Sequence, residues 1–382
     1  MEKVKSIKTL IPLTVVLAAV CIFSAMPVQI CEAREIKELH IGYQPSTHQI
    51  AEMIAMEKGW WADELKKFGI EKVTDGEFTS GPPEMTAMMA GELDIAYVGT
   101  APPITAIDKG LDAKIVAGVQ NKGSDLVLLP ELAANYTSPD DLKGSKMVIA
   151  TFPPGSIQYT ILTKWLSDNG LDPDKDVDIR EMGPREAISA IEARAVGGVF
   201  LPAPSPTIIE MEGAGERVVH SGDMWPDHAC CCLLVSEELI SEHPELVEQI
   251  IRIHINATEY IIEHPDEAAA VFAEKTGFEL EKTKESFKRT DMVWVHNPHP
   301  QISSGTEYAR VNYEMELTDK LLTEEDLYDT SFYDRIMGIA PTPSPSPSPS
   351  PTPAPTPTPG FTTVFAIGAL LVVAYLIFRR GV

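Results

Sequence analysis

The chain is poor in cationic residues. Lysine and arginine number 31 against 56 aspartates and glutamates, which gives a formal net charge of −25 at pH 7. So acidic a surface repels the phosphates of nucleic acids and anionic lipids, which argues against electrostatic binding to either. A small anionic ligand is not excluded, because a helix N-terminus or a group of backbone N–H donors can bind one without a cation.

Cysteine is also scarce. Of five cysteines, Cys21 and Cys31 lie near the N-terminus, and the other three are consecutive, Cys230 to Cys232. Neighbouring residues cannot form an ordinary disulfide without strain, and the spacing is not that of a zinc site. We therefore expect three small, buried strand residues and neither a metal nor a cofactor.

The chain lacks the common catalytic signatures. It has no phosphate-binding loop, no dinucleotide fingerprint and no Gly-x-Ser-x-Gly elbow between a strand and a helix. His296 and His299 have no carboxylate or cysteine at metal-ligand spacing. A Ser-His-Asp triad built from distant positions stays open. We expect no catalytic residues and no enzyme.

Both ends of the chain carry targeting features. Lysines, an apolar run and small residues predict a secretory signal peptide at residues 1–33. Residues 340–359 alternate proline with serine, threonine or alanine, which excludes helix and sheet and predicts an extended stalk. Residues 360–382 hold an uncharged apolar run before two arginines, long enough for a membrane span.

The last segment resembles the archaeal PGF sorting signal, in which Pro-Gly-Phe (here Pro359-Gly360-Phe361), an apolar span and a terminal arginine pair follow in order. The resemblance implies trimming by an archaeosortase and a lipid in place of the span; a permanent membrane anchor is the alternative. We expect the folded part on the extracellular face of the cell membrane, where the sequons at Asn135 and Asn256 could be glycosylated.

Residues 34–339 alternate short apolar runs with amphipathic stretches, which predicts an α/β fold. The order of strand and helix restarts after residue 140, so we expect two doubly wound sheets in two lobes, joined by crossing hinge strands. The apolar run 230–235 is expected to return the chain to the first unit. The predicted first lobe comprises residues 34–128 and 229–339, and the second comprises residues 129–228.

Two loops have a composition that suits an anion. Ser80 and Thr100 each precede a helix that begins with prolines, so the helix dipole and the first-turn N–H groups point at the loop. Either loop alone is typical of ordinary helix capping. Ligands of open α/β sheets bind beyond the carboxyl ends of strands. Two such loops on one cleft therefore favour binding.

The stretch Phe78 to Pro103 resembles the extracellular solute-binding proteins of ABC importers for aliphatic sulfonates, taurine and nitrate, and residues 40–44, 141–144 and 263–277 match as well. The resemblance implies a type II periplasmic-binding-protein fold, a two-lobed clamp that passes a small anionic or zwitterionic solute to a permease and its ATPase. By matching positions, the candidate ligand-binding residues are Tyr43, Gln44, Ser80, Gly81, Gly99 and Thr100 in the first lobe, and Gly155, Ser156 and Ile157 in the second. The segment Phe200 to Pro204 lacks the acidic residue that many members have there.

A second resemblance leaves an alternative open. Residues 229–245 are similar to the cysteine segment of the fungal pyrimidine-precursor synthase of thiamine biosynthesis, although Leu234 replaces a further cysteine. This alternative is a binding protein or enzyme for a pyrimidine, thiamine precursor or similar heteroaromatic, with Cys230–Cys232 involved. The aromatic residues available for stacking are Tyr43, Phe152, Tyr159 and Trp225. A third hypothesis, a surface adhesion protein, needs no cleft.

Overall fold

The computed structural model describes residues 35–340, and those up to Ile339 belong to one compact unit. The predicted signal peptide, the proline-rich stalk and the C-terminal apolar span lie outside the described residues. Within the described part, every helix is too short or too polar to cross a membrane.

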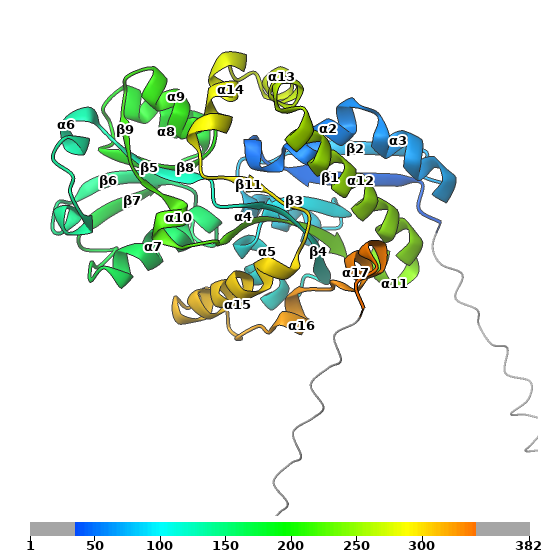
Figure 1. The fold of residues 1–382 in the computed structure, drawn as a ribbon. Coiled ribbons are helices and arrows are strands. Elements are labelled where there is room, and N and C mark those ends of the chain that lie inside the picture. Colours follow the sequence, from blue (N-terminus) through cyan, green and yellow to red (C-terminus); the bar gives the residue numbers. More distant parts are fainter. Residues whose placement is uncertain (1–34, 341–382) are drawn as a thin grey trace, which may run out of the picture. The chain divides into compact units, whose positions relative to one another are not determined.

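The first sheet has six strands in the order β11-β4-β10-β3-β1-β2 (Figure 1). Strands β1, β2 and β3 are parallel, whereas β10 lies antiparallel between β3 and β4. The apolar run that forms β10 thus returns the chain to the first sheet, as predicted. The strand bounds are β1 Glu38–Tyr43, β2 Lys72–Glu77, β3 Ile95–Gly99, β4 Ala113–Asn121, β10 Ala229–Ser236 and β11 Val293–Trp294.

The second sheet has five strands in the order β7-β6-β8-β5-β9. Their bounds are β5 Ser124–Leu128, β6 Met147–Thr151, β7 Val177–Glu181, β8 Gly198–Pro202 and β9 Glu216–His220. We expected residues up to 128 in the first lobe, and for β5 this is wrong, because it pairs with β8 and β9. Lys122 and Gly123, both with positive φ, turn the chain out of the first sheet directly after β4.

Helices cover the sheets (Figure 1). Helix α12 packs against α2 and α3 over the first sheet. Helix α14, expected in the first lobe, also packs against α9 of the second, where Lys282 pairs with Glu212. The helices are α2 Ile50–Glu57, α3 Trp60–Leu65, α4 Gly81–Met89, α5 Ala101–Asp108, α6 Pro130–Ala133, α7 Ile157–Asp168, α8 Pro184–Glu192, α9 Ser205–Met211, α10 Ser221–Met224, α11 Glu237–Glu242, α12 Pro244–Glu263, α13 Pro265–Thr276, α14 Leu280–Arg289, α15 His299–Glu314, α16 Glu324–Leu327 and α17 Ser331–Met337.

The core lies between the sheets and their helices. Strand β3 is buried at every position, which explains its unbroken apolar appearance in the sequence. Strand β5 is also buried throughout, although it begins with Ser124 and Asp125. Trp61, Tyr97 and Phe272 are among the largest fully buried side chains. Burial of side chains of this kind stabilises the fold by about 1.5–3 kcal/mol each.

Candidate functional site

The expected first-lobe residues stand at the carboxyl ends of three adjacent parallel strands. Tyr43 ends β1, Ser80 and Gly81 follow β2, and Gly99 ends β3. The chain passes so close at Gly81 that a methyl group there would lie 2.3 Å from Cγ of Pro102. Glycine is therefore needed for the β2–α4 loop to reach the start of α5.

The expected second-lobe residues face this edge. A methyl group at Gly99 would lie 3.0 Å from Cγ1 of Ile157, and one at Gly155 would lie 3.7 Å from Oγ1 of Thr105. The start of α7 therefore packs on the β3–α5 turn. The hydroxyl of Ser156 caps α7 by accepting a hydrogen bond from the N–H of Tyr159 at 3.2 Å.

All nine candidate residues are buried, so the structure has the two lobes in contact at this edge. Tertiary folding brings together the ends of β2 and β3, the beginning of α5 and the beginning of α7. A ligand held here would be removed from water, which strengthens hydrogen bonds to its charge.

The two proline loops do not cap their helices in the expected way. Neither Ser80 nor Thr100 makes a side-chain cap hydrogen bond, and the N–H of Thr100 donates to the carbonyl of Cys230 at 2.8 Å. Prolines at the second and third positions of α4 and α5 also remove two N–H donors from each first turn. Helix α7 has no proline in its first turn, so Ile157 and Gln158 keep their N–H groups.

Gln44 is held in place by two buried neighbours. Its side chain donates a hydrogen bond to Glu84, and its backbone N–H donates to Oε1 of Gln49 at 2.5 Å. Glu84 is fully buried, and burial raises the pKa of its carboxyl well above the usual value. Burial thus favours the uncharged form of this carboxyl, which accepts the hydrogen bond that fixes the orientation of the Gln44 amide.

The side chain of Tyr43 is directed at helix α13. Nζ of Lys275 lies 4.7 Å from the centre of the Tyr43 ring and 3.4 Å from Oε2 of Glu52, and it also pairs with Asp75. Burial raises the pKa of Glu52 to about 8, against the opposing charge of Lys275. Lys275 thus contacts both the Tyr43 ring and two acidic side chains of the same lobe.

Three crossing segments meet around Asp291. Its Oδ1 accepts a hydrogen bond from the N–H of Gly123 at 2.8 Å, and its Oδ2 accepts one from the N–H of Gly222 at 3.0 Å. Asp291 therefore ties the segment before β11 to the crossing at Gly123 and to helix α10 at Gly222. The crossing segments are 121–124 between β4 and β5, 225–229 between α10 and β10, and 290–293 between α14 and β11.

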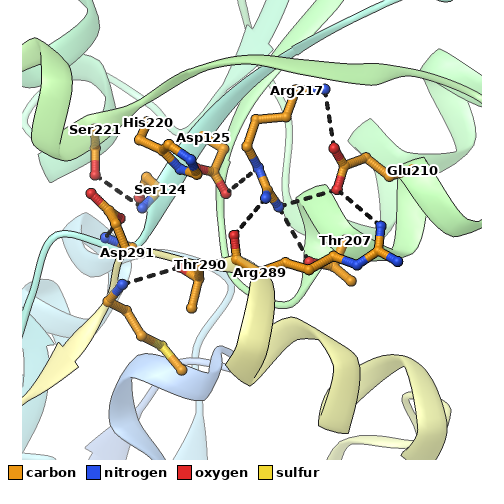
Figure 2. Close-up of polar contacts among 12 residues, drawn as sticks. Ser124, Asp125, Thr207, Glu210, Arg217, His220, Ser221, Arg289, Thr290 and Asp291 are labelled. Atoms are coloured by element: carbon orange, nitrogen blue, oxygen red, sulfur yellow. Dashed lines mark hydrogen bonds and ion pairs between the residues drawn. The ribbon is translucent and has the colours of Figure 1, made fainter.

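Beside this junction lies a network of charged residues around Asp125 (Figure 2). Oδ1 of Asp125 lies 2.6 Å from Nδ1 of His220, and Oδ2 lies 3.0 Å from Nε of Arg217. Arg217 also pairs with Glu210 and donates to the carbonyl of Arg289 at 2.6 Å. Asp125 lies in β5, Arg217 and His220 lie in β9, and Arg289 ends α14. The network therefore ties β5 and β9 to the end of α14.

The cysteines are buried, as expected, but one of their neighbours was not foreseen. Sγ of Cys230 lies 3.8 Å from Sγ of Cys231 and 3.3 Å from Nδ1 of His48. These three residues could together hold a metal ion. No sequence spacing links His48 to the cysteines; the only signal was its place in the loop after β1.

Three of the four aromatic residues considered for a heteroaromatic ligand have different neighbours. Trp225 packs on Tyr308 of α15, with ring centres 4.6 Å apart, and Tyr43 packs under Lys275. Tyr159 borders a separate surface cavity with Lys164. The contacts of Tyr43, Tyr159 and Trp225 therefore give no support for a shared stacking platform.

Residues 32–275 match the NMT1-like family. The chain belongs to this family. A Bacillus subtilis protein named for binding aliphatic sulfonates is 28% identical over 304 residues, which span 80% of this chain and 89% of that protein. Residues 358–380 match the PGF-CTERM motif, which confirms the resemblance seen in the sequence.

Solved structures establish the fold. The alkanesulfonate-binding protein of Xanthomonas axonopodis, bound to MOPS, superposes with a TM-score of 0.67 at 20% identity, covering 78% of this chain and 99% of that one. The periplasmic nitrate-binding protein of Synechocystis superposes with a TM-score of 0.69 at 17% identity, covering 80% of this chain and 89% of that one. The expected type II periplasmic-binding-protein fold is confirmed.

Proposed function

We propose that the protein is the solute-binding receptor of an ABC importer and captures a small anion of the sulfonate or nitrate class between its lobes. The observation that carries this proposal is the contact between the β3–α5 turn and the first turn of α7, where Gly99 meets Ile157. Relatives named for sulfonate and nitrate binding share the fold. The role is binding and delivery rather than catalysis.

The charge of the solute would be held by neutral donors. None of the nine candidate residues is cationic, and α7 provides a serine cap with N–H groups at its N-terminus. The positive end of a helix dipole stabilises an anion by about 0.3–1 kcal/mol, and more when the site is partly buried. Hydrogen bonds to a charged ligand add about 1.5–3 kcal/mol each.

The C-terminal motif supports a place at the cell surface. A PGF-CTERM motif at residues 358–380 fits an anchor made by an archaeosortase, with the receptor on the extracellular side and near its permease and ATPase. A tether of this kind raises the effective concentration of the receptor at the permease.

A calorimetric titration tests the proposal. The purified protein would be titrated with taurine, an alkanesulfonate, a mercaptosulfonate, nitrate and bicarbonate, with a pyrimidine thiamine precursor as the comparison ligand. We expect micromolar or tighter binding of one of the anions. Ser156→Ala should weaken that binding by about 10-fold, because it removes the cap that orders the first turn of α7.

A matched control uses Ser241, which is exposed in α11 and donates its hydroxyl to the carbonyl of Glu237. Ser241→Ala should leave the affinity unchanged. Binding of the pyrimidine alone, or equal loss in both variants, would contradict the anion assignment.

A further inference from the structure

The distortion of β10 places two neighbouring thiols on the same side. In a regular strand, successive side chains point to opposite faces. The register of β10 against β4 shifts between Ala229 and Cys231 and again between Cys231 and Cys232. As a result, Sγ of Cys230 and Sγ of Cys231 lie only 3.8 Å apart, although these residues are adjacent in the chain.

His48 presents a lone pair to these thiols. Its Nε2 lies 2.9 Å from the carbonyl of Gly123, and its Nδ1 lies 3.3 Å from Sγ of Cys230. A carbonyl only accepts hydrogen bonds, so Nε2 is the donor, and in the neutral ring Nδ1 carries the lone pair. Metal-binding histidines are commonly oriented in this way, by a backbone carbonyl on the other nitrogen.

Gly123 makes the close approach feasible. A methyl group on this residue would lie 2.8 Å from Nε2 of His48 and 2.4 Å from Cβ of Met292, and its φ of +82° also favours glycine. The turn that leads the chain out of the first sheet is therefore the same turn that orients the His48 ring.

We propose that His48, Cys230 and Cys231 form a binding site for a thiophilic metal ion, with Nδ1 and the two Sγ atoms as ligands. The three atoms lie within 4.8 Å of one another. With bonds of about 2.0 Å to nitrogen and about 2.3 Å to sulfur, ligand atoms around one ion lie about 3.5–4.0 Å apart. The observed separations of 3.3 and 3.8 Å need only small shifts to reach those values.

The number and softness of the ligands favour Cu(I). Two thiolates and one imidazole suit a soft ion, whereas a structural Zn(II) site has four ligands. Among the histidine, cysteine, aspartate and glutamate side chains of residues 35–340, the group around the thiols contains only these three. Gln49 is a donor here, because its Nε2 faces Sγ of Cys231 at 3.7 Å while its Oε1 accepts the N–H of Gln44.

Metal binding would connect three parts of the fold. Each bound thiol gives up its proton to solvent as its sulfur–metal bond forms, so binding releases protons. The ion would join the loop after β1 to β10, and through the His48 ring to the crossing segment at Gly123. It lies next to the anion site, since Cys231 pairs with Gly99. The metal site does not depend on the proposed transport function.

The test is a Cu(I) titration of the purified, reduced protein without oxygen, in competition with a chromogenic Cu(I) chelator. We expect one equivalent to bind, and we expect Cys230→Ser and Cys231→Ser each to weaken binding at least about 100-fold. Cys232→Ser is the matched control, because Cys232 is equally buried in the same strand but lies outside the group. It should retain one tight equivalent.

X-ray absorption of the copper-loaded wild-type protein provides a second readout that needs no variant to fold. We expect two sulfur scatterers and one nitrogen scatterer around the ion. No tight binding by the wild type, equal loss in Cys232→Ser, or tight binding of Zn(II) but not of Cu(I) would overturn the assignment. None of these outcomes would change the anion binding measured on the metal-free protein. Failure of the metal-site proposal is therefore distinct from failure of the proposed function.

Discussion

Two buried histidines should make the fold sensitive to acid. His254 is fully buried in α12, with Nε2 2.6 Å from the carbonyl of Gly118 and Nδ1 3.2 Å from the hydroxyl of Tyr97. His228 is fully buried directly before β10. Burial lowers the pKa of each imidazole to about 4, from the ordinary 6.5.

The size of the effect follows from proton linkage. Below pH 6.5 these two histidines are protonated in the unfolded chain but not in the folded protein. The free energy of unfolding therefore falls as the pH falls. The loss is complete near pH 4 and amounts to about 3 kcal/mol for each histidine at 1.36 kcal/mol per pKa unit. Glu52 acts in the opposite direction, because its raised pKa of about 8 removes stability as the pH rises from the unfolded value of 4.5 toward 8.

These contributions overlap in the pH dependence of the wild-type protein. The test therefore compares the pH dependence of a histidine variant with that of the wild type. Urea unfolding would be measured between about pH 7.5 and pH 4.5, for the wild type and for His254→Gln. The variant should lose stability less steeply in acid, by up to about 1.4 kcal/mol per pH unit, since one fewer proton is taken up on unfolding. His264→Gln is the matched control, because His264 is exposed just beyond the same helix. A slope of His254→Gln that equals that of the wild type would refute the reasoning.

Three further predictions concern the site and the hinge. Gly81→Ala should lower the free energy of unfolding by about 1–3 kcal/mol, measured by thermal melting, because its methyl group would overlap the Pro102 ring. The control is Gly183→Ala, where the methyl group meets open space and should change the free energy of unfolding by less than about 0.5 kcal/mol. Asp291→Asn should cost about 1–3 kcal/mol in urea unfolding, because an amide can accept only one of the two backbone N–H bonds. Gly99→Ala should weaken anion binding by about 5- to 150-fold in calorimetry while the fold persists. Its methyl group would press on Ile157 of α7 and so disfavour the contact between the lobes. Unchanged affinity would show that the lobes do not close there.

Local patterns in the sequence were sufficient for most elements. Unbroken apolar runs such as Ile95–Gly99 and Ala229–Ser236 become buried strands, because both of their faces are covered by helices or loops. The cap at Ser156 was also predictable, since a serine before a helix has a local hydrogen-bonding partner three residues later. Such features depend on residues close together in the chain.

Features that depend on distant residues were not predictable. Strand β5 follows β4 after two residues, yet it joins the other sheet, because the backbone at Lys122 and Gly123 turns away. The N–H of Thr100 is taken by the carbonyl of Cys230, which comes from a strand 130 residues later. A pattern in one segment carries no information about which partner reaches it.

The sequence by itself determined the class of the protein: an acidic α/β chain with a sorting motif and the strand-to-helix loops of a solute-binding family. Only the tertiary structure decided which groups meet. Gly99 lies against Ile157, and His48 lies against Cys230, because two sheets fold onto a shared hinge. The physical reason is that periodicity and capping act over a few residues, whereas a binding site needs side chains that the topology brings together from far along the chain.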